Sequence, residues 1–382
     1  MKILAIQNFM HQRAAGGAEL LCHDLFTGLA RLGHRVDVLT AGPEEYEEQY
    51  HIEPALASIP RTSHRRKLRT PLAKLRWLRV ARRNHHAVKA AIARHQPDVV
   101  YVHNTEWTTL APLAAAIGSG IRTVVHCHNH QYGDYWIKDR KAPSLVQRLF
   151  FNDPALERAS LIAVSRSVAR PLAGNGFPSD RLRVVHNGLP DEVLDGPCDG
   201  PRERKALFVG AVSRHKGVHV ALEAVALLRD EGIALPLEIV GAGSSTRYQA
   251  QLFLFAKRKK FAGAVTYVGT LLRRNTWERM RAAEMVLVPS LCAEAFGLVA
   301  VEAMACGALP VVSDRGALPE VVGDHGLVAE PTARGFADAI KRAIALPPEE
   351  RRRRRQAAHQ FAGTAYRIEE TVAQVEKVLA GG

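Results

Sequence analysis

The sequence predicts an α/β protein with two doubly wound domains, each a parallel sheet with helices on both faces. Short apolar runs of strand length alternate with helical patterns throughout the 382 residues, and one turn-rich stretch divides this alternation into two series. The chain is long enough for two domains, each with its own hydrophobic core. Its apolar content of 47% and charged content of 24% are ordinary for a globular protein.

The first series of apolar runs predicts the N-terminal domain. After its first strand, Gly16-Gly17-Ala18-Glu19 opens a helical pattern that continues to about Leu32 and is closed by Gly33. The five expected strands cover residues 3–6, 36–39, 99–102, 123–127 and 161–164.

The second series predicts the C-terminal domain. The boundary falls between Asn187 and Pro201, where closely spaced turn residues can continue neither a helix nor a strand. We therefore expect domains at 1–195 and 196–363, and a final helix over 364–379 with an apolar stripe. The six expected strands lie at 206–209, 237–240, 265–267, 285–288, 309–312 and near 326–328.

Two carboxylates eight residues apart mark the most informative part of the chain. Glu294 follows a buried strand that ends at Pro289, and Glu302 lies about one turn into the helix expected over 298–305. The open start of that helix, around Phe296, Gly297 and Leu298, suits an anion such as a diphosphate. The carboxylates could accept hydrogen bonds from sugar hydroxyls, so the segment predicts a sugar-nucleotide pocket.

The sequence motifs around these carboxylates resemble those of a known family. Glu294 and Glu302 match the E-x7-E element of retaining glycosyltransferases of family 4, and the segments at 307–314 and 318–322 match that family's next two motifs. The resemblance implies the GT-B fold, in which two Rossmann-like domains face an inter-domain cleft. It also implies that the N-terminal domain binds the acceptor, that the C-terminal domain binds the nucleotide sugar, and that the segment 364–382 returns to the N-terminal domain.

Further motifs of the donor half carry the same resemblance. Gly210 and Lys216 match a family element in which an arginine and a lysine hold the diphosphate, but Ala211 stands where the family usually has the arginine. Arg214 is the candidate replacement. A lysine here would offset the charge that grows on the leaving diphosphate. Gly243 and Val268 lie in turns that the family places near the nucleotide, although a structural role for each turn stays open.

In the acceptor half, Gly17 matches a family glycine whose backbone can approach phosphate or the reacting sugar. The alternating His126, His128 and His130 are expected on one face of a strand end, and His128 matches the family's strand-end histidine. It is the candidate catalytic residue together with Glu294. We do not expect zinc on these three histidines, because zinc ligands usually come from separate elements. His103 and Asn104 follow another strand and are candidates for lining the acceptor cleft.

The resemblance implies transfer of a hexose or aminohexose from a nucleoside-diphosphate sugar, with UDP the commonest nucleotide in the family. Glu302 would bind the ribose and Glu294 the transferred sugar, with retention of anomeric configuration. No cofactor and no divalent metal are expected, because protein cations and a helix dipole stabilise the leaving group. A GT-B epimerase that transfers no sugar is a weaker interpretation.

The net charge of +14 is concentrated in residues 61–94, which hold twelve Lys or Arg and no acidic residue. A helical stripe there runs from Leu75 to Ile92 and includes His85. Three interpretations stay open: a solvated helix packed by its stripe, a helix on an anionic membrane or groove for an acidic acceptor with Trp77 as an anchor, or a nucleic-acid site. No recognition motif accompanies the charge, so we expect no nucleic acid.

The acceptor is not fixed by the sequence. A lipid-linked or cell-surface glycan and a soluble aminocyclitol both fit, since Glu106, Asp134 and Asp139 could supply an acidic pocket for the latter. The start of the chain resembles a buried strand rather than a signal peptide, and five scattered cysteines form no C-x-x-C pair. We expect a cytoplasmic protein, with peripheral contact at the inner face of the membrane under the membrane interpretation.

Overall fold

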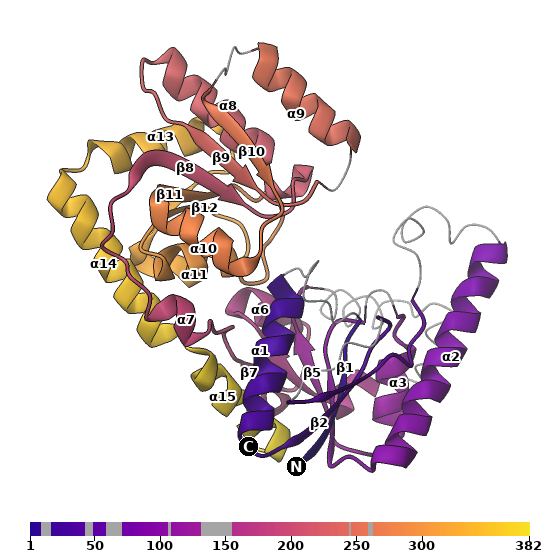
Figure 1. Cartoon of the computed structure of the whole chain (residues 1–382). Helices are drawn as coiled ribbons and strands as arrows, with labels where there is room; N and C mark the ends of the chain where they lie inside the picture. The colour runs from indigo at the N-terminus through magenta and orange to yellow at the C-terminus, as the bar shows by residue number, and fades with distance from the viewer. Residues whose placement is uncertain are drawn as a thin grey trace. The chain divides into compact units, whose positions relative to one another are not determined.

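The computed structural model describes residues 1–8, 17–42, 49–58, 71–105, 108–130, 155–243, 246–258 and 263–382. Two compact units result, one formed by 1–188 with 368–382 and the other by 189–367. Figure 1 shows a parallel sheet with flanking helices in each unit. Within the described part, no helix is both long enough and apolar enough to cross a membrane.

Unit 1 (1–188 with 368–382) holds a seven-stranded parallel sheet in the order β3-β2-β1-β4-β5-β6-β7. The helices α1 and α15 pack together, as do α2 and α3. The strands are β1 (Lys2–Ile6), β2 (Arg35–Leu39), β3 (His51–Glu53), β4 (Val99–Val102), β5 (Thr123–Cys127), β6 (Ser160–Ala163) and β7 (Leu182–Val184). The helices are α1 (Gly17–Arg31), α2 (Pro71–His95), α3 (Ala111–Gly118), α6 (Arg166–Gly174) and α15 (Ile368–Ala380).

Unit 2 (189–367) holds a six-stranded parallel sheet in the order β10-β9-β8-β11-β12-β13. Its core packs α8 against α13 over the central strands. The strands are β8 (Glu203–Val209), β9 (Leu237–Val240), β10 (Val265–Gly269), β11 (Ala283–Val288), β12 (Leu309–Ser313) and β13 (Leu327–Ala329). The helices are α7 (Asp191–Leu194), α8 (Val218–Asp230), α9 (Thr246–Arg258), α10 (Arg273–Ala282), α11 (Leu298–Ala305), α12 (Leu318–Val322), α13 (Ala333–Ala345) and α14 (Pro348–Ala365).

Both sheets therefore have the same strand order, in which the chain starts at the centre, runs to one edge and then crosses to the other. Strands β4, β5 and β11 are buried along their whole length, as expected where helices cover both faces. The order reverses between β1 and β4 in unit 1 and between β8 and β11 in unit 2. Ligands of such sheets bind outside the carboxyl ends of the strands at this switch point.

The unit boundaries lie at 188/189 and 367/368, whereas the sequence suggested 195/196 and 363/364. The segment after Gly188 stays with unit 2 because the Leu189 amide donates to the Tyr366 carbonyl at 2.7 Å, and Arg367 pairs with Asp191 and Asp195. The helix expected over 364–379 is confirmed from Ile368 onward, but it starts four residues later than predicted. Tyr366 leaves the helical conformation and its hydroxyl donates to the Val321 carbonyl, so α14 ends before it and α15 begins at Ile368.

Candidate functional site

Unit 2 brings two loops together at its switch point. One loop follows β8 and carries Lys216, and the other follows β11 and carries Glu294. The Lys216 Nζ lies 2.6 Å from Glu294 Oε1, and the buried Ser290 donates its hydroxyl to the same oxygen. Residues that lie 78 positions apart thus form one charged pair where the fold predicts a ligand.

Glycine and backbone contacts hold these loops in place. Gly217, directly after Lys216, has φ of 73°, and a Cβ built there would lie 1.9 Å from the Pro289 carbonyl oxygen. The Leu291 amide donates to the His215 carbonyl at 2.8 Å. The two loops therefore approach closely only because residue 217 has no side chain.

The start of α11 is open, as the sequence predicts. Gly297 is its N-cap residue with φ of 100°, and no side chain caps the helix. Phe296 is buried against the ring of Tyr366, while Leu298 is partly exposed. The first backbone N–H groups of α11 and the positive end of its dipole suit an anion.

Glu302 lies in the second turn of α11 and faces α10. Trp277 Nε1 donates to Glu302 Oε1 at 3.1 Å, and Arg273 Nε lies 3.5 Å from the same oxygen. The Arg273 guanidinium also lies over the Trp277 indole, 5.0 Å from its centre. Sequence reasoning missed both partners, although their i, i+4 spacing on one helix could have indicated a shared face.

The other donor-half candidates lie on neighbouring loops. Arg214 is exposed at the start of the 3-10 turn that contains Lys216, and has no ion pair with any described residue. Gly243 follows β9 and pairs with Val212 as a β-bridge beside the β8 loop. Val268 is partly exposed near the end of β10. All three lie at carboxyl ends of adjacent strands, and their contacts with a nucleotide stay a prediction.

Unit 1 gathers its candidates at the carboxyl ends of β4 and β5. His103 follows β4 and is buried, and His128 follows β5 and is partly exposed. His103 Nδ1 lies 2.8 Å from His128 Nε2. The backbone N–H of Asn104 donates to Gln7 Oε1 at 3.1 Å. Gly17 is exposed at the start of α1.

The structure adds a residue that the sequence did not single out. Cys22, from the second turn of α1, places its Sγ 3.3 Å from His103 Nδ1 and 3.8 Å from His128 Nε2. The rings of His126 and His128 stack 4.2 Å apart, so these two histidines do share a face. Gly16, Glu106, Asp134 and Asp139 lie outside the described residues.

Cys22, His103 and His128 are uncharged at neutral pH, although part of the His128 side chain is exposed. Burial lowers the pKa of His128 to about 3 and, together with the nearby His128, lowers the pKa of His103 well below its ordinary value. Burial raises the pKa of the Cys22 thiol well above its ordinary value, and Glu19 and Asp24 add to that shift. His128 can therefore donate or accept a hydrogen bond, but it is a weak proton acceptor for a reaction at neutral pH.

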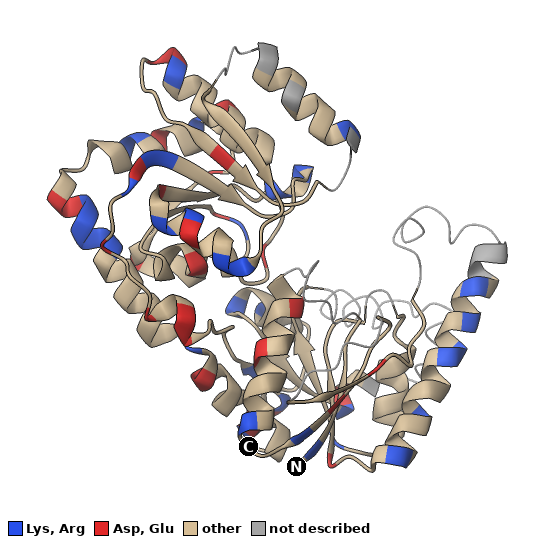
Figure 2. Cartoon of the chain, in the orientation of Figure 1, with Lys and Arg blue, Asp and Glu red and all other residues tan. Residues whose placement is uncertain are grey.

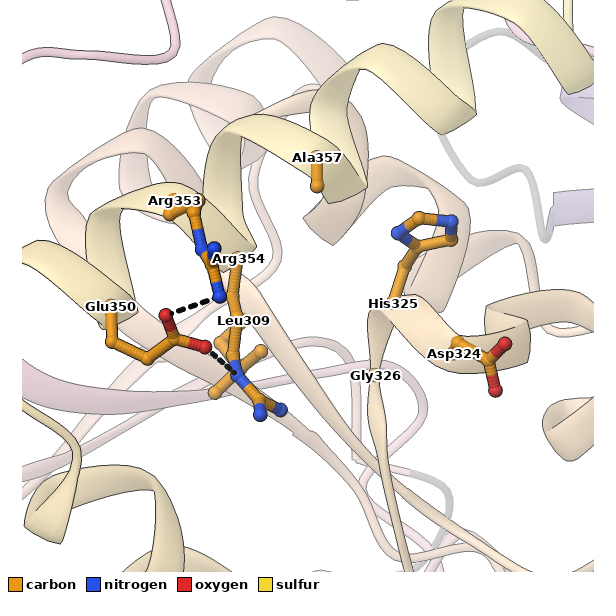
Figure 3. A pocket seen from close by; sticks show the side chains of 8 residues that line it. All are labelled: Leu309, Asp324, His325, Gly326, Glu350, Arg353, Arg354 and Ala357. Carbon is orange, nitrogen blue, oxygen red and sulfur yellow. Dashed lines mark hydrogen bonds and ion pairs between the residues drawn. The ribbon is translucent and has the colours of Figure 1, made fainter.

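A separate hollow of about 420 Å³ in unit 2 lies at the other end of its sheet (Figure 3). Leu309 and Gly326, at the amino ends of β12 and β13, line it together with Glu350, Arg353 and Arg354 of α14. Figure 3 shows both arginines directed to Glu350, and the ion pairs measure 2.7 and 3.0 Å. Both arginines share the single carboxylate of Glu350, and the hollow is remote from the switch point.

Two family models match the chain, one in each unit. The model described as "Glycosyltransferase Family 4" matches residues 15–193, and the model described as "Glycosyl transferases group 1" matches residues 200–361. Together they span nearly all of the chain between residues 15 and 361.

Individual relatives agree with the family models. An uncharacterised glycosyltransferase of Methanocaldococcus jannaschii is 26% identical over 84% of this chain and 83% of its own length. The phosphatidyl-myo-inositol mannosyltransferase of Mycolicibacterium smegmatis is 30% identical over 69% of this chain and 66% of its own. The crystal structure of Anabaena HepE in complex with UDP and glucose superposes with a TM-score of 0.76 at 20% identity, covering all of both chains.

The superposition on HepE shows a shared fold, and the sequence matches show the family. The superposition agrees with the two Rossmann-like units. The chain belongs to glycosyltransferase family 4 and is a glycosyltransferase of the GT-B fold.

Proposed function

We propose that the protein transfers a hexose or aminohexose from a nucleoside-diphosphate sugar, with UDP as the preferred nucleotide, to an acceptor hydroxyl with retention of configuration. The Lys216–Glu294 pair at the switch point between β8 and β11 carries this proposal. It sets a cation for phosphate next to a carboxylate for sugar hydroxyls, beside the open start of α11.

The donor would be held by groups from three elements. Lys216, with Arg214 beside it, and the first amides of α11 bind the diphosphate, whose negative charge grows as the glycosidic bond breaks. The hydrogen bonds and ion pairs that described residues make with Glu294 and Glu302 all involve the Oε1 atom of each carboxylate. The Oε2 atoms are then available to the transferred sugar at Glu294 and to the ribose at Glu302.

Retention is proposed to follow a front-face route. The bond from the anomeric carbon to the diphosphate oxygen breaks, the acceptor oxygen bonds to the same face, and its proton passes to the departing diphosphate. His128 binds near the donor sugar as a neutral hydrogen-bonding group, in keeping with its low pKa. Lys216 and the α11 dipole stabilise the leaving group, so the proposed reaction needs no divalent metal.

UDP is proposed as the nucleotide because family 4 uses it most often. HepE, which has the same fold, was crystallised with UDP and with UDP-glucose. The proposed donor is therefore a UDP-hexose or UDP-aminohexose.

For the acceptor we propose a lipid-linked or cell-surface glycan, and α2 is the reason. Its exposed side carries Arg76, Arg79, Arg82, Arg83 and Lys89, and the helix contains no acidic residue (Figure 2). Such a helix attracts anionic lipid head groups, at about 1 kcal/mol per basic residue near the surface. The mannosyltransferase relative is named for an anionic phospholipid, which supports the same choice. A soluble aminocyclitol is the alternative acceptor.

Thermal stabilisation by nucleotides tests the donor site. With EDTA present, a nucleoside diphosphate at about 100 times its dissociation constant adds roughly 2.7 kcal/mol to the free energy of unfolding. We expect UDP to raise the melting temperature of the wild type more than GDP, ADP or dTDP. Glu302→Gln should lose most of this shift.

Glu238→Gln is the matched control, because Glu238 of β9 is a similarly buried carboxylate of unit 2 that pairs with Lys205 of β8 and Arg279 of α10. It should lower the basal melting temperature and keep the UDP shift. If no diphosphate stabilises the wild type, or if both variants lose the shift equally, the donor site is misplaced. The anomeric configuration of the product, read by NMR, tests retention separately.

A further inference from the structure

Three ligand atoms of different chain segments converge in unit 1. They are Cys22 Sγ from α1, His103 Nδ1 after β4 and His128 Nε2 after β5, and all lie within 4.8 Å of one another. The Sγ lies 3.3 Å from the His103 nitrogen and 3.8 Å from the His128 nitrogen, while the two nitrogens lie 2.8 Å apart. Sequence reasoning considered only neighbouring histidines of one strand, and so missed this set.

These separations are close to those around a tetrahedral metal. With zinc–sulfur bonds of about 2.3 Å and zinc–nitrogen bonds of about 2.0–2.1 Å, tetrahedral angles require about 3.5 Å between sulfur and nitrogen and about 3.3 Å between the nitrogens. Each observed distance in unit 1 differs from this by about half an ångström or less. The three ligand atoms therefore have nearly the spacing that a tetrahedral ion requires.

We propose that Cys22, His103 and His128 bind one divalent transition-metal ion, with Zn²⁺ as the preferred ion, and leave its fourth position open. The ion forms bonds to both imidazole nitrogens and to the thiolate of Cys22, whose proton passes to solvent. Three protein ligands with one open position are typical of zinc sites that exchange a water or another small ligand. A set of two imidazoles and one thiolate also suits copper, so the two metals are separate arms of the test.

The surrounding rings hold the ligands in position. His103 is fully buried, with its ring in edge contact with Phe26 at 5.1 Å and with Tyr101 at 4.1 Å between centres. His126 stacks on His128 from the neighbouring strand position. Cys22 is also fully buried, whereas His128 is partly exposed and gives an ion a path from solvent.

Occupancy of this site would inhibit the enzyme, an effect that rests on the proposed function. A bound ion engages His128 Nε2, and the proposed function places the His128 ring against the donor sugar or acceptor. The metal would therefore compete with substrate in unit 1. It would leave the nucleotide contacts of unit 2 unchanged, so UDP stabilisation in EDTA tests the proposed function independently.

Direct metal titration of the full chain tests the site. We expect the metal-free wild type to bind one Zn²⁺ per chain, and Co²⁺ to give the intense near-ultraviolet absorption of a thiolate–cobalt bond. Cys22→Ala should weaken Zn²⁺ binding about 100-fold or more. Cys127→Ala removes another buried cysteine of unit 1 whose thiol lies outside the cluster, and should change the affinity less than threefold.

Several outcomes would overturn the proposal. Failure of the wild type to bind stoichiometric Zn²⁺ is one, and Co²⁺ binding without thiolate absorption is another; neither needs a variant to fold. Equal weakening by Cys22→Ala and Cys127→Ala would also contradict it. Tight Cu²⁺ binding with an intense visible band, without Zn²⁺ binding, would overturn the choice of zinc. Zn²⁺ inhibition, measured against each variant's own metal-free rate, should disappear in Cys22→Ala.

Discussion

Each carboxylate of the candidate donor site is positioned by a cation that the sequence places far from it. Lys216 lies 78 residues before Glu294, and Arg273 lies 29 residues before Glu302. In both cases only Oε1 is engaged among described residues. A diphosphate that draws Lys216 away would release one of the two contacts on Glu294 Oε1, so the ion pair fits a resting state that substrate rearranges.

A side chain at residue 217 would destabilise the fold for two reasons, the positive φ and the lack of space, and these two contributions can be measured separately. Gly217→Ala places a Cβ 1.9 Å from a backbone oxygen that cannot move alone, in addition to the strain of a positive φ. We expect a loss of about 2–4 kcal/mol in the free energy of unfolding, measured with urea.

Gly232→Ala supplies the comparison, since Gly232 has φ of 81° with no atom within 4 Å of the added Cβ. It should cost about 1 kcal/mol, the conformational part alone. Equal losses in the two variants would show that the loops after β8 and β11 do not depend on close contact.

The buried histidines make stability fall in acid. The pKa values of His103, His126 and His128 are lowered in the folded state by burial, so below about pH 6.5 the unfolded state takes up protons first. Folding therefore loses up to about 1.4 kcal/mol per pH unit for each of these histidines as the pH falls.

His126→Asn should reduce this slope by about one third, because Asn can replace the hydrogen bond between His126 Nδ1 and the Tyr101 hydroxyl without taking up a proton. Urea midpoints at pH 7.0 and 5.0, measured in EDTA, give the slope. His86→Asn, at an exposed position of α2, is the control and should leave it unchanged. A slope unaltered by His126→Asn would contradict the assignment.

The sequence was sufficient to place some of the candidate residues on their loops and helix ends. Glu294, Lys216 and the open start of α11 lie where local patterns and motif spacing place them. Three further contacts were not predicted: Trp277 with Glu302, Ser290 with Glu294, and Cys22 with His103. The first and the third join residues at least 25 positions apart and depend on tertiary packing. Spacing along the chain carries no signal for such contacts.

Among the elements, α2 buries a face that differs from the predicted apolar stripe, because the polar residue Asn84 is buried with its hydrogen bonds made. Its fully buried positions include Ala81, Asn84 and Val88, not the predicted His85, which is only partly buried, and Leu75 is exposed. Asn84 exchanges two hydrogen bonds with the Ala57 backbone and donates to the Thr108 carbonyl at 2.6 Å. Burial is favourable because all three bonds are made.

The exposed side of α2 makes the membrane proposal testable. Replacing Arg79, Arg82 and Arg83 by Gln should reduce binding to vesicles containing 30% anionic lipid by about 100-fold, from about 1 kcal/mol per charge. The control replaces Arg352, Arg353 and Arg354, three exposed arginines of α14, and should change binding little. Sedimentation with vesicles measures both. Equal losses would indicate attraction by net charge alone.

The two strands absent from the prediction, β3 and β7, are the two edge strands of the unit 1 sheet. β3 has three residues, of which only Ile52 is buried, and β7 is half-exposed to exposed along its length. Neither presents the apolar run that identified the central strands. The central strands of both sheets were predicted to within about three residues because burial on both faces demands such runs.

At the scale of the whole molecule, α15 belongs to unit 1, although all of unit 2 separates it in sequence from the rest of that unit. His34 Nε2 lies 2.7 Å from Glu376 Oε1, and Arg122 donates to the Val378 carbonyl at 2.8 Å. Gly28 of α1 faces Val372, and a Cβ added there would lie 2.5 Å from Val372 Cγ2. Residues 368–382 thus complete the helical layer of unit 1.

A double-mutant cycle measures this contact. Gly28→Ala normally favours a helix by about 1 kcal/mol, but here we expect a net loss of about 1–3 kcal/mol from the clash. Val372→Ala alone leaves a gap, and the double variant should recover at least about 1 kcal/mol relative to additivity. Additive losses in urea denaturation would mean that α1 and α15 are not in close contact.

The place of α15 in the chain has a consequence for biosynthesis. The ribosome makes Gly28 and the rest of α1 early, but α15 emerges only after the whole of unit 2 has been translated. At about 5–20 residues per second, this delay is on the order of ten seconds or more. Unit 2 can complete its core first, while the face of α1 that packs on α15 stays uncovered in nascent unit 1 and accessible to chaperones until α15 arrives.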